Sequence, residues 1–213
     1  MTVNTFSLNR SIRKRQAGYT LIELSISLAI IAVLLVGTLT GVQRLLRSNN
    51  ANNTVSTTQS AMTYITKLYA ASGSNSIYTT TQLAQMGVWD STVVTLTGTG
   101  AAQTATVKNP FGGSINVYSN TAAVGTGTTA AATGTGFWYR LGGIPSESCA
   151  SVATSFINTA AAIYVSSAAT TTGIVPIAAN SAYKVPGTAT STPNLATSCA
   201  SAGTLEVSLF IPS

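Results

Sequence analysis

Apolar residues follow two patterns in the first third of the chain. From Leu24 to Val42, nineteen consecutive residues carry no charge, and at the rise of an α-helix they span about 28 Å, close to the thickness of a bilayer's hydrocarbon core. In residues 51–70, apolar side chains recur at helical spacings of seven, three and four. These side chains are Val55, Met62, Ile65 and Tyr69. The two patterns predict one N-terminal helix of about fifty residues whose second half buries one face.

The remaining residues predict a head of mixed helices and strands. One short helix covers the sequence QLAQM, capped by Thr80 or Thr81 and ending at Gly87. Another has Pro145 in its first turn and points Cys149 toward the core. Strands are expected at Ser114–Tyr118, after the turn Asn109–Gly113, and at Gly136–Leu141, Ala161–Val165 and Thr204–Ile211. The predicted fold class is therefore α+β.

Stretches rich in small polar residues interrupt this pattern. Residues 120–136 and 168–198 consist mostly of Ala, Gly, Ser and Thr, and we expect surface loops there, either packed or flexible. A shorter polar break is expected at Ser72–Ser76. The aromatic residues Trp89 and 137–139 are expected in the core or at contacts between chains, rather than in a ligand platform.

Positive charge precedes the apolar stretch and fixes its orientation. Arg10, Arg13, Lys14 and Arg15 lie before it without an acidic residue among them, so the positive-inside rule keeps that end in the cytoplasm. Everything after Arg47 is then exported. A secretory signal peptide is the alternative, since it also joins a basic region to an apolar run. The longer run and the helical pattern that continues beyond it favour an anchor.

Glu23 is the one charge near the start of the apolar helix. On insertion scales a carboxylate costs about 2.5 kcal/mol or more at the centre of a membrane helix and less near the interface. The side chain either reaches the interface and stays hydrated, or it needs a cation. A cut after Gly18 would create an α-amino group on Tyr19, which a second copy of the helix can bring to Glu23. The charge would then be neutralised on assembly.

The sequence GYTLIEL at residues 18–24, behind the basic leader, resembles the processing site of type IV prepilins. The resemblance implies cleavage after Gly18 by a prepilin peptidase on the cytoplasmic face, N-methylation of Tyr19, and a role for Glu23 in assembly. It also implies the type IV pilin fold, in which the head packs an antiparallel sheet against the C-terminal half of the long helix. Glycine suits the scissile position because it lets the peptidase approach the peptide closely.

The leader and the head resemble the type IVb subclass. An eighteen-residue leader and a first residue other than phenylalanine are typical of that subclass. Lys108–Ser119 (KNPFGGSINVYS) and Leu141–Phe156 (LGGIPSESCASVATSF) are similar to segments of the toxin-coregulated pilin and of pilins from thin conjugative pili. The implied organisation is a leader at 1–18, a membrane and filament-core helix at 19–48, and a globular head at 49–213.

Gly37 and Gly41 form a G-x-x-x-G within the apolar helix. The spacing favours close helix packing, although small residues are common in membrane helices in any case. Because glycine has a poor helix propensity, we also expect residues 37–41 to be the place where the helix loosens in a filament.

Composition excludes several kinds of chemistry. The chain has no histidine, four acidic residues and two cysteines, so it lacks the groups for histidine-based catalysis, a cysteine-histidine zinc site or paired carboxylates. We expect no catalytic site, no metal site and no cofactor. The formal charge is +6, but four of the ten basic residues lie in the leader. The head is almost neutral and has no basic stripe, so we expect no nucleic-acid binding by it.

Cys149 and Cys199 are the only cysteines, fifty positions apart. In an exported, oxidising location we expect a disulfide between them, with two free buried thiols as the alternative. In the chain-entropy model, closing such a loop contributes about 4 kcal/mol. In the pilins that the sequence resembles, this disulfide bounds the surface-displayed D-region, which here would be residues 149–199.

Three functions are compatible with these features. The first is the major structural subunit of a type IVb pilus, held in the inner membrane of a Gram-negative bacterium and then assembled into an extracellular filament. Its partners would be other copies of itself, the prepilin peptidase and the assembly machinery. The second is a minor pilin or a type II secretion pseudopilin; Glu23 argues against the tip-initiating kind, and three head acids supply a calcium site poorly. The third is a membrane-anchored periplasmic enzyme or binding module, which predicts a monomer.

Overall fold

The computed structural model describes six stretches of the chain. The described residues are 19–72, 78–119, 136–166, 182–186, 189–201 and 203–212. The predicted leader with Gly18, residues 120–135, 168–181 and 187–188 of the predicted loops, and the break after Ser72 lie outside them. The chain divides into two compact units, Met1–Arg44 and Leu45–Ser213, and each is described by itself.

The predicted N-terminal helix is confirmed. Helix α1 runs from Leu21 to Ser72, and in the second unit one of its faces is buried. Three of the four predicted apolar positions lie on this face, and the fourth, Val55, is partly buried against the same core. The buried residues are Ala51, Thr54, Thr58, Ala61, Met62, Ile65 and Tyr69. Four of these seven side chains are Ala or Thr, so small side chains make up much of the buried face.

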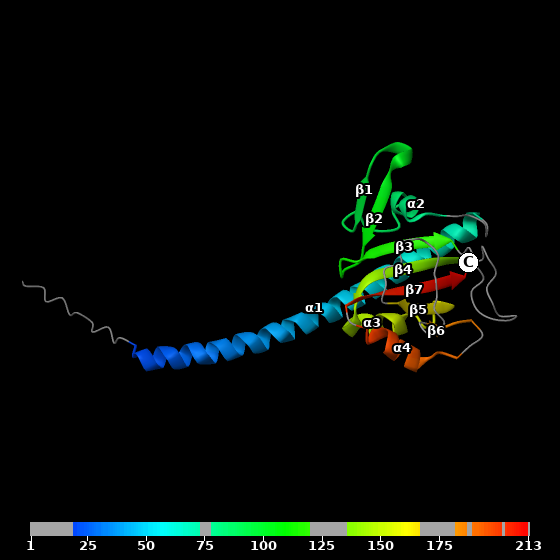
Figure 1. The fold of residues 1–213 in the computed structure, drawn as a ribbon. Coiled ribbons are helices and arrows are strands. Elements are labelled where there is room, and N and C mark those ends of the chain that lie inside the picture. Colours follow the sequence, from blue (N-terminus) through cyan, green and yellow to red (C-terminus); the bar gives the residue numbers. More distant parts are fainter. Residues whose placement is uncertain are drawn as a thin grey trace, which may run out of the picture. The chain divides into compact units, whose positions relative to one another are not determined.

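Seven antiparallel strands of the described residues form one sheet in the order β1-β2-β3-β4-β7-β5-β6 (Figure 1). The strands are β1 (Val94–Thr97), β2 (Thr104–Lys108), β3 (Ser114–Ser119), β4 (Gly136–Pro145), β5 (Ala162–Ser166), β6 (Ala182–Lys184) and β7 (Thr204–Pro212). The strands predicted at β3, β4, β5 and β7 are thus present, whereas β1, β2 and β6 were not predicted. The last strand in sequence, β7, lies between β4 and β5, so β1 and β6 form the two edges.

The two faces of the sheet bury different side chains, because alternate residues of a strand point to opposite faces. Phe137 and Tyr139 of β4 join the larger core, which includes α1. Trp138 belongs to a second cluster, in which its ring lies 5.2 Å from that of Phe210 and 5.7 Å from that of Tyr164, measured between centroids. The four aromatic residues expected in the core are all buried. The head is therefore α+β, with an antiparallel sheet packed on a long helix.

Within the described stretches, the head also contains three short α-helices and one 3-10 helix. They are α2 (Thr80–Gln85), η1 (Gly100–Ala102), α3 (Ser146–Ser155) and α4 (Thr192–Cys199). The predicted cap of α2 is wrong by one residue, since Thr79 accepts from the N–H of Gln82 at 3.3 Å, and the Gln82 side chain accepts from the N–H of Thr79 at 2.9 Å. Thr80 and Thr81 instead accept hydrogen bonds from the backbone of β3 and β2. A reciprocal capping box therefore begins the helix.

Two further predictions need correction. Strand β4 continues past Leu141 through a register shift and ends at Pro145, whose extended backbone (φ −61°, ψ 143°) makes it the residue before α3 and not part of its first turn. Residues 168–198 are not all loop, because β6 and most of α4 lie within them. The side chain of Ser191 caps α4 by accepting a hydrogen bond from the N–H of Asn194 at 3.3 Å. In the sequence, this capping serine cannot be distinguished from the many Ser and Thr residues around it.

Candidate assembly site

Thr20 caps the N-terminal end of α1. Its Oγ1 accepts a hydrogen bond from the backbone N–H of Glu23 at 3.3 Å, and its carbonyl oxygen accepts from the N–H of Leu24 at 3.1 Å. Glu23 is therefore the third residue of the helix. The predicted site residues did not include Thr20, although Thr-x-x-Glu is the spacing of a capping box and could have identified it.

Glu23 lies where a helix best tolerates a negative charge. The N–H groups of the first turn carry the positive end of the helix dipole, which stabilises a carboxylate by about 0.3–1 kcal/mol. In the part of the chain that the structure describes, Glu23 forms no ion pair, and the next cation along α1 is Arg44. The dipole thus offsets only part of the cost of burying this charge. The proposed pairing of Glu23 with a new N-terminus at Tyr19 stays a prediction.

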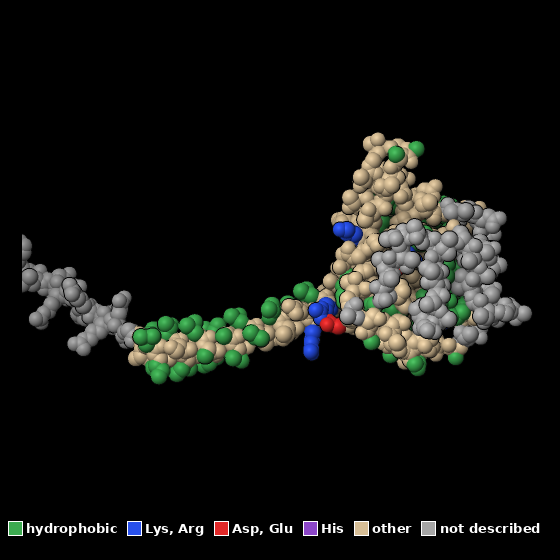
Figure 2. Space-filling view, viewed as in Figure 1, with side chains coloured by type: hydrophobic (Ala, Val, Ile, Leu, Met, Phe, Trp, Pro, Cys, Tyr) green, Lys and Arg blue, Asp and Glu red, His purple; other side chains and the backbone are tan. Residues whose placement is uncertain are grey.

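Large apolar side chains of the first unit are exposed. From Leu21 to Val42 their exposed fractions lie between 50 and 85%, and Figure 2 shows them as a hydrophobic surface along the helix. Within the described residues, α1 is the one helix long and apolar enough to cross a membrane. Burying one Leu or Ile side chain fully contributes about 1.5–3 kcal/mol, so contact with lipid or with other apolar helices would stabilise this surface strongly.

Polar groups within the apolar stretch are satisfied by the helix itself. Hydroxyl groups at four positions donate to backbone carbonyls three or four residues earlier, at 2.7–3.0 Å. They belong to Ser25, Ser27, Thr38 and Thr40. At Gly37 and Gly41 the helix is continuous, and an added Cβ would meet no atom within 4 Å. Both glycines are therefore open to a neighbouring helix, while loosening of this segment in a filament stays a prediction.

The two head segments that resemble type IVb pilins meet in the structure. Buried Asn109 donates from Nδ2 to the carbonyl of Gly142 at 2.7 Å, and its Oδ1 accepts from the N–H groups of Phe111 and Gly113 at 2.9 and 3.2 Å. The backbones approach so closely that a Cβ on Gly113 would lie 1.9 Å from the Gly142 oxygen. These residues thus fix the start of β3 against the irregular part of β4.

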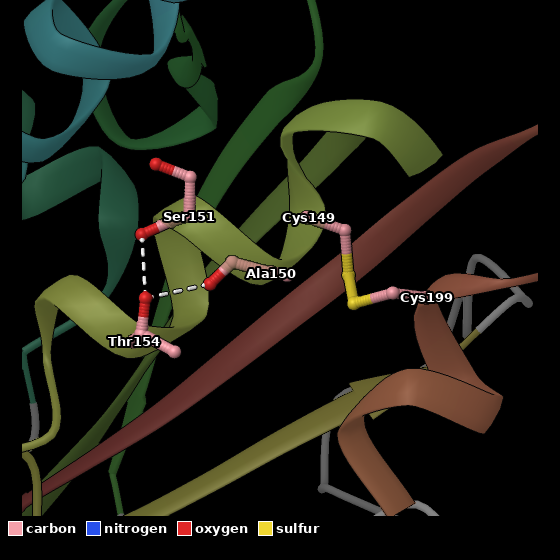
Figure 3. Close-up of a disulfide and its surroundings, with 5 residues drawn as sticks. All are labelled: Cys149, Ala150, Ser151, Thr154 and Cys199. Atoms are coloured by element: carbon pink, nitrogen blue, oxygen red, sulfur yellow. Dashed lines mark hydrogen bonds between the residues drawn. A yellow bond between two sulfur atoms is a disulfide. The ribbon is translucent and has the colours of Figure 1, made fainter. Parts of the chain in front are cut away.

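Cys149 and Cys199 form the predicted disulfide, with their Cα atoms 5.7 Å apart (Figure 3). The bond joins α3 to α4, and both cysteines are buried. On the exposed side of α3, Thr154 donates to the carbonyls of Ala150 and Ser151 at 2.8 and 3.2 Å. The two ends of the predicted D-region are therefore held by helices that the disulfide connects.

Lys184 of β6 holds the chain that follows α3. Its Nζ donates to the carbonyl oxygens of Ile157 and Ala160 at 2.5 and 2.7 Å. Both carbonyls belong to the turn between α3 and β5, so the ammonium group ties this turn to β6. This contact could not be predicted from the sequence, because the acceptors are backbone carbonyls more than twenty positions before Lys184.

Other charged groups of the head also make structural contacts. Arg47 of α1 pairs with Glu147 in the first turn of α3, and both side chains are partly exposed. Arg140 and Glu206 are buried on neighbouring strands, with Nε and Oε2 3.7 Å apart, and the Arg140 guanidinium lies 5.4 Å from the centre of the Tyr118 ring. Among the described residues, no group of three His, Cys, Asp or Glu could hold a metal ion.

A buried hydrogen bond lies within the larger core. Trp89 Nε1 donates to the hydroxyl of Tyr139 at 3.0 Å, and burial raises the pKa of this hydroxyl, an effect that the bond from Trp89 only partly offsets. Nearby, the backbone N–H of Thr92 lowers the pKa of the exposed Asp90 carboxyl, to which it donates at 2.8 Å. Both contacts stabilise local structure, and neither places a nucleophile beside a base.

Comparisons with known proteins agree with this architecture. Residues 13–39 match the family model of the prokaryotic N-terminal methylation motif. No match was found among curated proteins. The crystal structure of a type IVb pilin from Salmonella typhi is similar, with a TM-score of 0.51 and 18% identity over 76% of this chain and 99% of that chain. That of TcpA, a type IV pilin from the Vibrio cholerae El Tor biotype, gives a TM-score of 0.47 and 17% identity over 77% and 98%.

The methylation motif and the fold concern different parts of the molecule. The motif includes Gly18, Tyr19 and Glu23, and it ends within the apolar part of α1. The fold adds the antiparallel sheet, the long helix behind it and the disulfide between α3 and α4. The chain therefore joins the prokaryotic N-terminal methylation motif to a head with the fold of a type IVb pilin.

Proposed function

We propose that the chain is the major structural subunit of a type IVb pilus. A prepilin peptidase cuts it after Gly18, Tyr19 becomes the N-methylated first residue, and the processed chain polymerises into a surface filament. Before assembly, the precursor lies in the inner membrane of a Gram-negative bacterium, with its head on the outer side of that membrane. The filament serves adhesion, aggregation or conjugative mating contact.

The observation that carries this proposal is the uncovered apolar surface of α1 behind a single carboxylate, that of Glu23 in the first turn of the helix. A helix that only anchors a head has no use for Glu23, whose burial costs free energy. In a bundle of helices, the carboxylate can accept the α-amino group of a neighbouring Tyr19, and the exposed apolar side chains become buried among copies of themselves. The apolar surface of α1 would then hold the precursor in the membrane first and pack in the filament core afterwards.

The head supports a structural role rather than a chemical one. From residue 49 onward the chain carries four basic and three acidic side chains, and the described ones engage in structural contacts or lie apart from one another. Subunit contacts would then depend on apolar packing and hydrogen bonds. We expect assembled filaments to be only weakly sensitive to salt, and ready dissociation in high salt would contradict this.

Mass spectrometry of sheared surface filaments tests the proposal. It should find this chain as the abundant component, beginning at methylated Tyr19 and with Cys149 and Cys199 oxidised. A chain beginning elsewhere, or one absent from the filaments, would overturn the proposal. A chain present only in trace amounts would indicate a minor pilin.

A pair of variants tests the role of the charge separately from that of the helix cap. Glu23→Gln removes the carboxylate but keeps the side-chain shape, so we expect normal cleavage and a large loss of filaments. Thr20→Ala removes the cap but keeps the charge, so it should assemble. Equal filament yields from Glu23→Gln and the unaltered chain would refute a role for the charge.

A further inference from the structure

The outer edge of β1 has unpaired backbone groups. In the described part of the chain, β1 pairs only with β2. The N–H of Lys108 donates to the carbonyl of Val93 at 2.9 Å, so by alternation along an antiparallel ladder Thr95 also faces β2. The backbone N–H and C=O groups of Val94 and Leu96 therefore point away from the sheet. Figure 1 shows the β1–β2 hairpin at this edge.

In the described part of the chain, strand β1 is short, which is itself one protection of an edge, but it lacks the protections that come from charge or proline. Protective edges carry charges, prolines or bulges, or are covered by other segments. Strand β1 has the sequence VTLT without charge or proline, three of its four residues are exposed, and the Leu96 side chain is 46% exposed. The opposite edge differs, because the carbonyl of Tyr183 in β6 accepts from the N–H of Ser191 at 2.8 Å.

We propose that β1 pairs antiparallel with β1 of a second copy of this chain in a neighbouring filament. The two outward-facing residues determine the register, in which Val94 of each strand lies opposite Leu96 of the other. Thr95 then lies opposite Thr95 on the twofold axis, in a pair without backbone hydrogen bonds. Each contact would comprise four backbone hydrogen bonds, two apolar cross-strand pairs and one pair of threonines.

Symmetry indicates that the partner belongs to another filament. Subunits along a polar helical filament are related by heterologous contacts, whereas the β1 pairing is isologous and closes on itself. The pairing therefore cannot propagate one filament, but it can join two filaments. Because the proposal assumes that the chain forms a pilus, it rests on the proposed function.

Area and charge agree with lateral association. A strand of four residues buries much less than the roughly 1,200 Å² of a stable interface, so an isolated pair would be weak. Two filaments repeat the contact many times, and the second and later pairs form at a high effective concentration. With four basic and three acidic residues from position 49 onward, the heads repel one another little, so the strands can approach closely.

Engineered cysteines test the register on filaments of the full-length chain. With Thr95→Cys, the two sulfur-bearing residues would face each other at a Cα distance of about 4.5 Å, within the range of a disulfide. We expect a reducible dimer of subunits after mild oxidation. With the control Thr97→Cys, on the same strand, the two positions would be about 13 Å apart, too far to link. Filaments that assemble normally but give no Thr95→Cys dimer, or equal dimer from both variants, would overturn the proposal.

Dilution of the filaments shows whether the Thr95→Cys cross-link lies within one filament or between two filaments. Cross-links between filaments should decline when sheared filaments are diluted before oxidation, and cross-links that persist unchanged would place the contact within one filament and refute the proposal. The absence of filaments from the unaltered chain would instead refute the proposed function. The two failures are thus distinguishable.

A charged substitution tests lateral association without cysteines. Leu96→Lys introduces a protective charge on the edge, so low-speed centrifugation should sediment several-fold fewer filaments as bundles. The matched control is Met86→Lys, because Met86 is 40% exposed and lies outside β1. Similar bundling by both variants, with filament yield unchanged, would contradict pairing through β1.

Discussion

Replacement of Gly113 by alanine would disturb the contact between the start of β3 and the irregular part of β4. The added Cβ would lie 1.9 Å from the carbonyl oxygen of Gly142, so the two backbones must separate by about 1 Å before the contact reaches 3.0 Å. The movement weakens the 2.7 Å hydrogen bond from Asn109 to Gly142. Overpacking and an unpaired buried amide each cost about 1–3 kcal/mol, so we expect the free energy of unfolding to fall by about 3 kcal/mol or more.

Gly112→Ala is the matched control for this variant. Gly112 has a φ of +84°, but an added Cβ would meet nothing within 4 Å, so its cost is only the left-handed backbone, about 1–2 kcal/mol. Urea unfolding of the full chain in detergent, followed by the fluorescence of buried Trp89 and Trp138, measures both variants. If Gly113→Ala were no more destabilising than Gly112→Ala, the close backbone approach would be refuted.

Three further predictions concern the second unit. Replacing both Cys149 and Cys199 by alanine should lower the free energy of unfolding by about 4 kcal/mol in the same urea titration, and a loss below about 1 kcal/mol would contradict the loop-entropy argument. Burial raises the pKa of Tyr139 above its ordinary value of 10.0, so its contribution is complete below pH 10 and declines above it, by up to about 1.4 kcal/mol per pH unit. Tyr139→Phe should reduce this decline in urea titrations at alkaline pH, whereas an unchanged slope would show that Tyr139 is not its source. Because the Arg47–Glu147 pair is partly exposed, Glu147→Gln should cost less than about 1 kcal/mol and nothing in high salt, and a cost that persists in salt would argue against a screened pair.

Periodicity in the sequence predicted the elements that bury one regular face. The spacings from Val55 to Tyr69 identified the buried side of α1, and the alternation in Thr204–Ile211 identified β7, because the apolar residues of each element face the larger core. Strands β1 and β2 were not predicted, because both lie near the sheet edge and most of their side chains are exposed. Without a buried face, a strand has no hydrophobic period to detect.

Contacts between backbone atoms that are distant along the chain could not be predicted from the sequence, for a different reason. The glycines at 113 and 142 could be recognised as turn residues, but nothing in either segment says that the two backbones touch. Lys184 likewise bonds to carbonyl groups, which every residue possesses. The disulfide was predictable because the chain has only two cysteines. Glu23 was noticed because a carboxylate conflicts with its apolar surroundings, while its pairing with a neighbouring N-terminus stays a prediction.

The central position of β7 determines when the head can finish folding. Strand β7 spans Thr204–Pro212, and its neighbours β4 and β5 do not pair with each other. Until residues 204–212 join the sheet, it consists of two separate halves, and contacts of such long sequence separation form slowly. A chain truncated before residue 204 would therefore expose two open strand edges, on β4 and on β5, so a protease could distinguish chains that carry β7 from chains that lack it.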